Sequence, residues 1–205
     1  MSKSFEDSTV QFAYNSIHNF FDVCNLDHAL KYTEGILEAA ISDKIWKKES
    51  PSSLLFYMEN FRSLYGAAFT IHYNYSKRSE AVIVKPEDGV PDITVTQNFM
   101  DERFYLSSVW SKFPRNLTAA QYHDPYRAIK KFCTYMAEPE WNNYLKDVTE
   151  FALSKDTLDE VYNPQNILTV RLRMMQLVEA CHLINIRTNR KKAKPKSKKK
   201  KKHTK

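Results

Sequence analysis

Hydrophobic positions recur at spacings of three and four residues over most of the chain, which is the period of an amphipathic helix. The first stripe lies in residues 5–23 and consists of Phe5, Phe12, Ala13, Ile17, Phe20 and Phe21. A second stripe follows in residues 26–45. Both predict a helix that turns one face towards a core, and Gly35 is the weakest position of the second helix because glycine disfavours helix interiors.

Four later helix starts are marked by proline next to a residue suited to a helix N-terminus. Ser50-Pro51, Asp124-Pro125 and Asn163-Pro164 each place a capping side chain before a proline, whose missing N–H is not needed in the first turn. Glu138-Pro139-Glu140 brings negative charge to a helix N-terminus, where the helix dipole favours it. We expect a helix to begin at each of these sites and a further helix over residues 96–113.

The last predicted helix is apolar on most of its circumference. Its two stripes are Ile167, Val170, Met174, Leu177, Val178, Cys181 and Ile184, and Leu168, Leu172, Met175, Leu183 and Ile186. Such wide coverage predicts a central helix that other helices surround. The helix runs directly into a basic segment, whose first turns we expect to remain helical.

A change of pattern interrupts the helices near residues 81–95. Two β-branched runs flank the turn-forming residues Lys85–Pro91, which predicts a small β-hairpin or a loop. The chain has only three glycines, too few for most β-rich folds. We therefore predict a mainly all-α fold, a bundle of six or seven helices with this hairpin or loop and a disordered basic C-terminal tail.

Length and composition fit this organisation. Of the 205 residues, 42% are hydrophobic and 13% aromatic, which suits a folded body rather than a disordered chain. We divide the chain into a helical body, residues 1–186, and a Lys-rich tail, residues 187–205. A subdivision of the body near residues 76–96 is the alternative.

Charge separates these two parts sharply. The tail holds twelve of the 31 basic residues and no acidic one, whereas the body holds all 24 acidic residues. The basic residues of the tail are Arg187, Arg190, Lys191, Lys192, Lys194, Lys196, Lys198, Lys199, Lys200, Lys201, Lys202 and Lys205. A dense cationic run of this kind is typically neutralised by the phosphates of RNA or DNA. Because lysine outnumbers arginine, we expect contact with phosphates without recognition of base sequence.

These features predict a non-enzymatic accessory or adaptor protein. In this hypothesis the helical body binds a protein partner and the tail contacts RNA or DNA. A pure protein-interaction component with a targeting or solubilising tail is one alternative. The N-terminal residues lack the pattern of a secretory signal, and no apolar run reaches the roughly 20 residues of a membrane span. We expect a cytoplasmic location, with a nuclear or nucleoid-associated one as the alternative, and three reduced cysteines.

Candidate catalytic residues are sparse. His18, Cys24 and His28 carry atoms that zinc binds, but their spacing matches no common zinc motif, so we predict neither a metal nor another cofactor. The carboxylate and lysine pattern of metal-dependent nucleases, phosphate loops and nucleophile elbows are absent. The remaining alternative is an enzyme, nuclease-like or metal-dependent, whose site combines dispersed residues, with His72 and His123 as further candidates.

Overall fold

The computed structural model describes residues 2–74, 76, 78–83 and 114–190. These residues form seven α-helices and two 3-10 turns. The helices are α1 (Ser2–Val23), α2 (Leu26–Ala40), α3 (Pro51–Tyr73), α5 (Ala119–His123), α6 (Tyr126–Tyr135), α7 (Glu138–Leu153) and α8 (Pro164–Arg190), and the turns are η2 (Glu80–Val82) and η5 (Leu158–Glu160). The mainly α-helical bundle is confirmed, with no strand among the described residues.

Three predicted features lie wholly or largely outside those residues. The hairpin or loop near 81–95 is described only as far as residue 83, where the chain forms the end of η2 and the extended residue that follows it. The predicted helix over 96–113 and the tail beyond residue 190 lie outside the described part of the chain.

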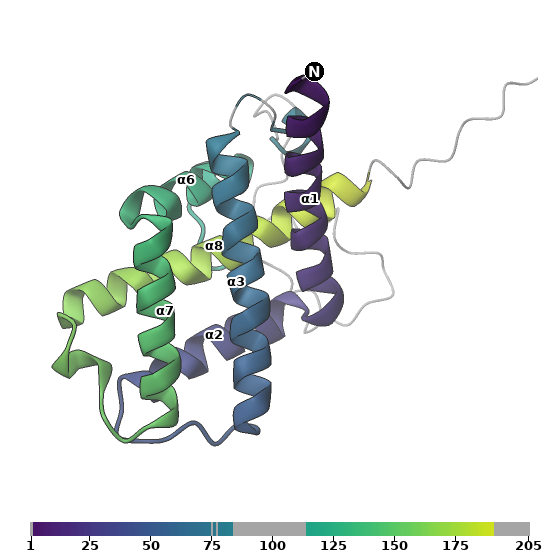
Figure 1. The fold of residues 1–205 in the computed structure, drawn as a ribbon. Helices are drawn as coiled ribbons and strands as arrows, with labels where there is room; N and C mark the ends of the chain where they lie inside the picture. Colours follow the sequence, from purple (N-terminus) through teal and green to yellow (C-terminus); the bar gives the residue numbers. More distant parts are fainter. Residues whose placement is uncertain (1, 75, 77, 84–113, 191–205) are drawn as a thin grey trace, which may run out of the picture.

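The helices form two layers that share one hydrophobic core (Figure 1). In one layer α3 packs between α1 and α7, and the three helices alternate in direction. Behind this layer α8 crosses the bundle and contacts α1, α2, α3, α5 and α6. The predicted central position of α8 is confirmed.

The helix starts predicted at the prolines are confirmed, because each start depends on local contacts alone. Ser50 Oγ accepts the Ser53 N–H at 3.2 Å and caps α3. Asn163 Oδ1 accepts the Gln165 N–H at 2.9 Å at the start of α8. Asp124 Oδ1 accepts the Tyr126 N–H at 3.1 Å, although Pro125 itself occupies the cap position of α6.

Three details of the predicted stripes are wrong. Phe12 is 72% exposed, because the buried line of α1 runs through Ala13, one residue and about 100° further around the helix. Leu168 and Leu172 are 62% and 42% exposed, since the first turns of α8 extend past α7 (Figure 1). The second helix ends at Ala40 rather than continuing to residue 45.

Candidate functional site

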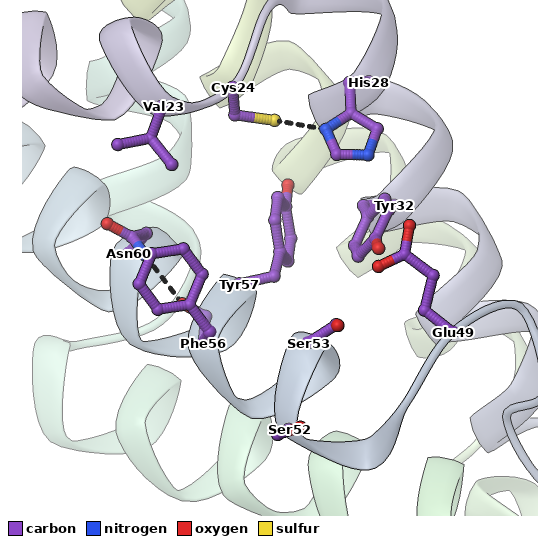
Figure 2. Close-up of a pocket in the computed structure, with 10 residues that line it drawn as sticks. All are labelled: Val23, Cys24, His28, Tyr32, Glu49, Ser52, Ser53, Phe56, Tyr57 and Asn60. Carbon is purple, nitrogen blue, oxygen red and sulfur yellow. Dashed lines mark hydrogen bonds between the residues drawn. The ribbon is translucent and has the colours of Figure 1, made fainter.

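A pocket of about 360 Å³ lies where α1, α2 and α3 meet. Figure 2 shows the ten residues that line it. Its wall holds two side chains that could react chemically, since Cys24 Sγ lies 3.2 Å from His28 Nδ1. A thiol and an imidazole within hydrogen-bonding reach are the elements of a nucleophile with an adjacent base.

The connection between α1 and α2 positions this pair. Cys24 continues the last turn of α1, where its N–H donates to the Phe20 carbonyl at 3.0 Å. Asn25 then caps α2, and its Oδ1 accepts the His28 N–H at 2.9 Å. The cap places His28 in the first turn of α2, four residues after Cys24 and on the same side of the connection. A local capping interaction thus brings the two side chains together.

Burial controls the protonation of the thiol. It raises the pKa of Cys24 to about 11, so the sulfur is a neutral thiol near pH 7. The thiol can donate its proton to His28 Nδ1, or more weakly to the Asn25 carbonyl at 3.7 Å. Because only the thiolate is strongly nucleophilic, Cys24 needs a base that accepts this proton during a reaction.

An acidic group completes the polar side of the pocket. The nearby Tyr32 hydroxyl, with smaller contributions from Ser53 and from the charge of His28, holds the pKa of Glu49 below its usual value. Burial and the nearby Glu49 carboxylate raise the pKa of Tyr32 to about 12. The rings of Tyr32 and His28 also pack edge to face, with their centroids 4.4 Å apart. In Figure 2 the imidazole therefore lies between the Cys24 sulfur and the Tyr32–Glu49 pair.

The structure does not assemble His18, Cys24 and His28 into a metal site. His18 Nδ1 lies 3.1 Å from Asn185 Oδ1 on α8, and its Nε2 lies 3.5 Å from Asp22. Within the described residues, no three His, Cys, Asp or Glu side chains form a group that could hold a metal ion.

Cys24 and His28 are candidate residues from the sequence, whereas Tyr32, Glu49 and Ser53 are not. Tyr32, Glu49 and Ser53 come from three different places, α2, the connection before α3 and the first turn of α3. The only available signal was Glu49 directly before the Ser50-Pro51 cap. That signal locates a helix start and says nothing about which neighbouring helix the carboxylate will face.

The other candidate histidines lie apart from the pocket lining. Burial, with smaller contributions from Lys130 and Arg78, lowers the pKa of His72 in the last turn of α3. His123 ends α5, and its buried Nδ1 has no hydrogen-bond partner among the described residues.

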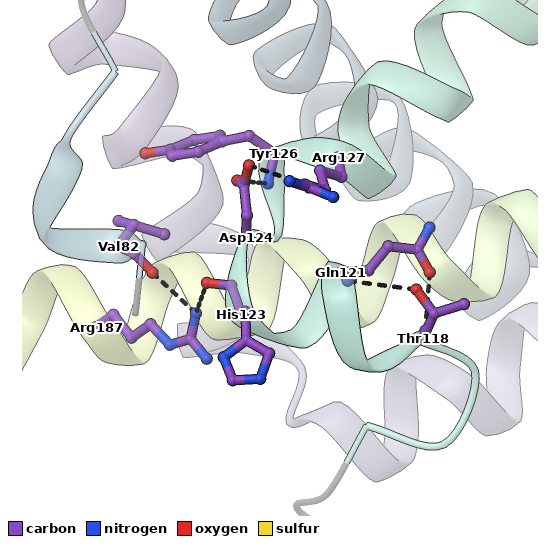
Figure 3. Close-up of polar contacts among 8 residues, drawn as sticks. All are labelled: Val82, Thr118, Gln121, His123, Asp124, Tyr126, Arg127 and Arg187. Carbon is purple, nitrogen blue, oxygen red and sulfur yellow. Dashed lines mark hydrogen bonds and ion pairs between the residues drawn. The ribbon is translucent and has the colours of Figure 1, made fainter. Parts of the chain in front are cut away.

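The second notable region is the C-terminal end of α8. Arg187 donates from Nη1 to the Val82 carbonyl at 2.8 Å and to the His123 carbonyl at 3.3 Å, and from Nη2 to the Tyr122 carbonyl at 2.7 Å. Figure 3 shows this guanidinium between η2 and α5. The first basic residue of the predicted tail therefore fastens two segments of the body to α8.

Comparisons with known proteins add no relative. No family model matches the chain, and no curated protein and no solved structure matches it significantly. None of the helices in the described ranges is long and apolar enough to cross a membrane.

The predicted phosphate-binding residues divide into three groups. The Arg187 guanidinium donates its hydrogen bonds to backbone carbonyls of the body. Arg190 is the last residue of α8, and the structure describes its backbone there. The ten remaining residues, Lys191, Lys192, Lys194, Lys196, Lys198, Lys199, Lys200, Lys201, Lys202 and Lys205, lie outside the described residues. The prediction that the basic turns after residue 186 begin as helix is confirmed as far as Arg190.

Proposed function

We propose that this protein is an accessory or adaptor protein that binds RNA or DNA phosphates through its Lys-rich tail while its helical body binds a protein partner. The observation that carries this proposal is the charge separation. Twelve basic residues and no acidic residue occupy positions 187–205, whereas the preceding residues are net acidic. An acidic body opposes binding to phosphate over the rest of the surface, so attraction is concentrated in the tail.

The attachment of the tail supports a tethering function. α8 contacts five other α-helices and continues without interruption to Arg190. Arg187 ties its last turns to η2 and α5. A nucleic acid that binds the residues after Arg190 is therefore held close to the folded body rather than at the end of a long linker.

The body offers a surface for a partner on the N-terminal half of α8. Leu168 and Leu172 are four residues apart, lie on one face of the helix and are exposed. Val161, just before α8, is exposed as well. We expect the substitution of Leu168 and Leu172 by Glu to abolish capture of the partner while leaving the fold intact.

The decisive experiment compares the full chain with a variant that ends at Arg190. This end point removes ten lysines and keeps the Arg187 contacts. Binding to short RNA, single-stranded DNA and duplex DNA is measured across a salt series. Six to eight phosphate contacts predict a slope of log K against log salt of roughly −5 to −7 for the full chain. The shortened variant should lose most of the affinity and most of the slope.

Two charge variants serve as matched controls. Replacement of the ten lysines by Arg preserves the charge and should preserve the slope, whereas replacement by Gln should reproduce the truncation. A truncated body that binds nucleic acid as tightly as the full chain would contradict the proposal. Absence of binding by the full chain at low salt would contradict it too, and salt-insensitive capture of one protein would then favour the pure interaction component.

A further inference from the structure

We propose that Cys24 and His28 form a thiol–imidazole site that accepts a small acyl group from an activated ester or thioester. This proposal does not depend on the function proposed for the basic tail. Its foundation is the distance of 3.2 Å between Cys24 Sγ and His28 Nδ1 on the wall of a pocket. That separation allows direct proton transfer from the thiol to the imidazole.

The size and lining of the pocket determine the class of substrate. A volume of about 360 Å³ lies at the lower end of the range for small-molecule sites. Val23 and Phe56 are exposed apolar side chains on its rim, and the ring of Tyr57 forms part of its floor (Figure 2). An apolar rim beside a sulfur nucleophile suits a small acyl group rather than a large or highly charged substrate.

The environment also supports the charges that develop during acyl transfer. The Glu49 carboxylate lines the same pocket, and the charge of His28 is one of the influences that lower the pKa of Glu49. The N-terminal ends of α2 and α3 both border the pocket, through His28 and Ser53. The positive ends of two helix dipoles favour negative charge on a carbonyl oxygen bound there.

The proposed step is balanced within the site. With p-nitrophenyl acetate as the probe, Cys24 Sγ forms a bond to the carbonyl carbon while the thiol proton passes to His28 Nδ1. The ester C–O bond breaks, and p-nitrophenolate leaves with the electron pair. His28 then returns its proton to water. Since the resting thiol is neutral, the base must act during the attack rather than before it.

The experiment measures acetylation of each cysteine in the full-length protein by peptide mass spectrometry after exposure to p-nitrophenyl acetate. Cys133 and Cys181 are internal controls, because both are buried and free. Cys24 should react faster than either of them. His28→Asn should lower the rate at Cys24 by about 100-fold, the lower limit for an effective general base. Lysine acetylation, counted on separate peptides, should not change.

A second measurement keeps the test valid if His28→Asn disturbs the fold. Acetylation of Cys24 in the unaltered protein should be slower in D2O than in H2O, because a proton moves during the attack. Equal rates at Cys24, Cys133 and Cys181 would overturn the proposal. A folded His28→Asn variant that retains the full rate, or equal rates in D2O and H2O, would overturn it as well.

Discussion

Replacement of Glu179 by Ala should destabilise the protein more than a change at any exposed acidic residue. Glu179 lies on α8 and is fully buried. Its carboxylate accepts hydrogen bonds from the main-chain N–H groups of Arg115, Asn116 and Leu117 at 2.7, 2.8 and 3.1 Å, and from the Asn116 side chain at 2.9 Å. Burial raises the pKa of Glu179, and these four donors oppose that shift. The carboxylate is thus the acceptor that fastens residues 115–117 to the central helix.

The magnitude follows from the donors that would lose their acceptor. Arg115 is exposed, so water can replace the carboxylate at its N–H, whereas Asn116 and Leu117 are half-buried. Two partly buried donors without a partner cost about 1–3 kcal/mol each. Removal of a buried charge also removes its desolvation penalty, which offsets part of this loss of stability. We expect Glu179→Ala to lower the free energy of unfolding by about 3 kcal/mol.

Glu179→Gln separates hydrogen bonding from side-chain volume. The amide keeps one acceptor oxygen but turns an NH2 group towards donors that need an acceptor, so the loss should be about 2 kcal/mol. Glu150→Gln is the matched control. Glu150 is exposed, with its carboxylate 3.7 Å from Lys146 one turn earlier on α7, and its change should cost less than about 0.5 kcal/mol.

Urea unfolding followed by circular dichroism measures all three variants, and amide hydrogen exchange shows whether α5 loses protection first. A free energy of unfolding for Glu179→Gln within about 0.5 kcal/mol of the unaltered protein, the size expected for a surface change, would refute the anchoring role of Glu179. A loss of stability in Glu179→Ala no larger than that in Glu150→Gln would refute this role as well.

Three further predictions concern other contacts. Ser50→Ala should lower the free energy of unfolding by about 1 kcal/mol through loss of the α3 cap, whereas urea unfolding of Ser52→Ala should show a smaller change. Arg187→Gln should cost about 2 kcal/mol because hydrogen bonds to three carbonyls are lost, and hydrogen exchange should increase in α5. The pKa of Glu49 is lowered, so its contribution to stability is present above about pH 4.5 and is lost as the pH falls through the lowered pKa. In a series of thermal melts at decreasing acid pH, the melting temperature of Glu49→Gln should therefore fall less steeply than that of the unaltered protein.

Part of the candidate site was accessible from the sequence. Cys24 and His28 stand four residues apart around the capping residue Asn25, and a cap orders its neighbours through contacts within a few residues. From the sequence the two residues were candidate ligands of a metal site that we did not predict, whereas the structure places Cys24 Sγ within 3.2 Å of His28 Nδ1. Glu49 joins them only through the tertiary approach of α3 to α2, where the Tyr57 hydroxyl donates to the Ala29 carbonyl at 2.9 Å, and no local pattern specifies that approach.

The sequence by itself determined where most helices begin and that the last one is central. Those features depend on capping side chains, on proline and on apolar periodicity, all of which act within one or two turns. The sequence also determined the charge separation between body and tail, because the number of charged residues in a segment does not depend on how the chain folds.

Only the tertiary structure decided which polar side chains the core accepts. Glu179 interrupts an apolar stretch of α8. Its contribution to stability depends on hydrogen-bond donors more than sixty residues earlier in the chain. By sequence Arg187 is the first residue of the basic tail, yet its guanidinium donates hydrogen bonds to carbonyl groups of η2 and α5. Burial of a charge is tolerated only where packing brings enough partners to it, and packing depends on contacts between residues far apart in the chain.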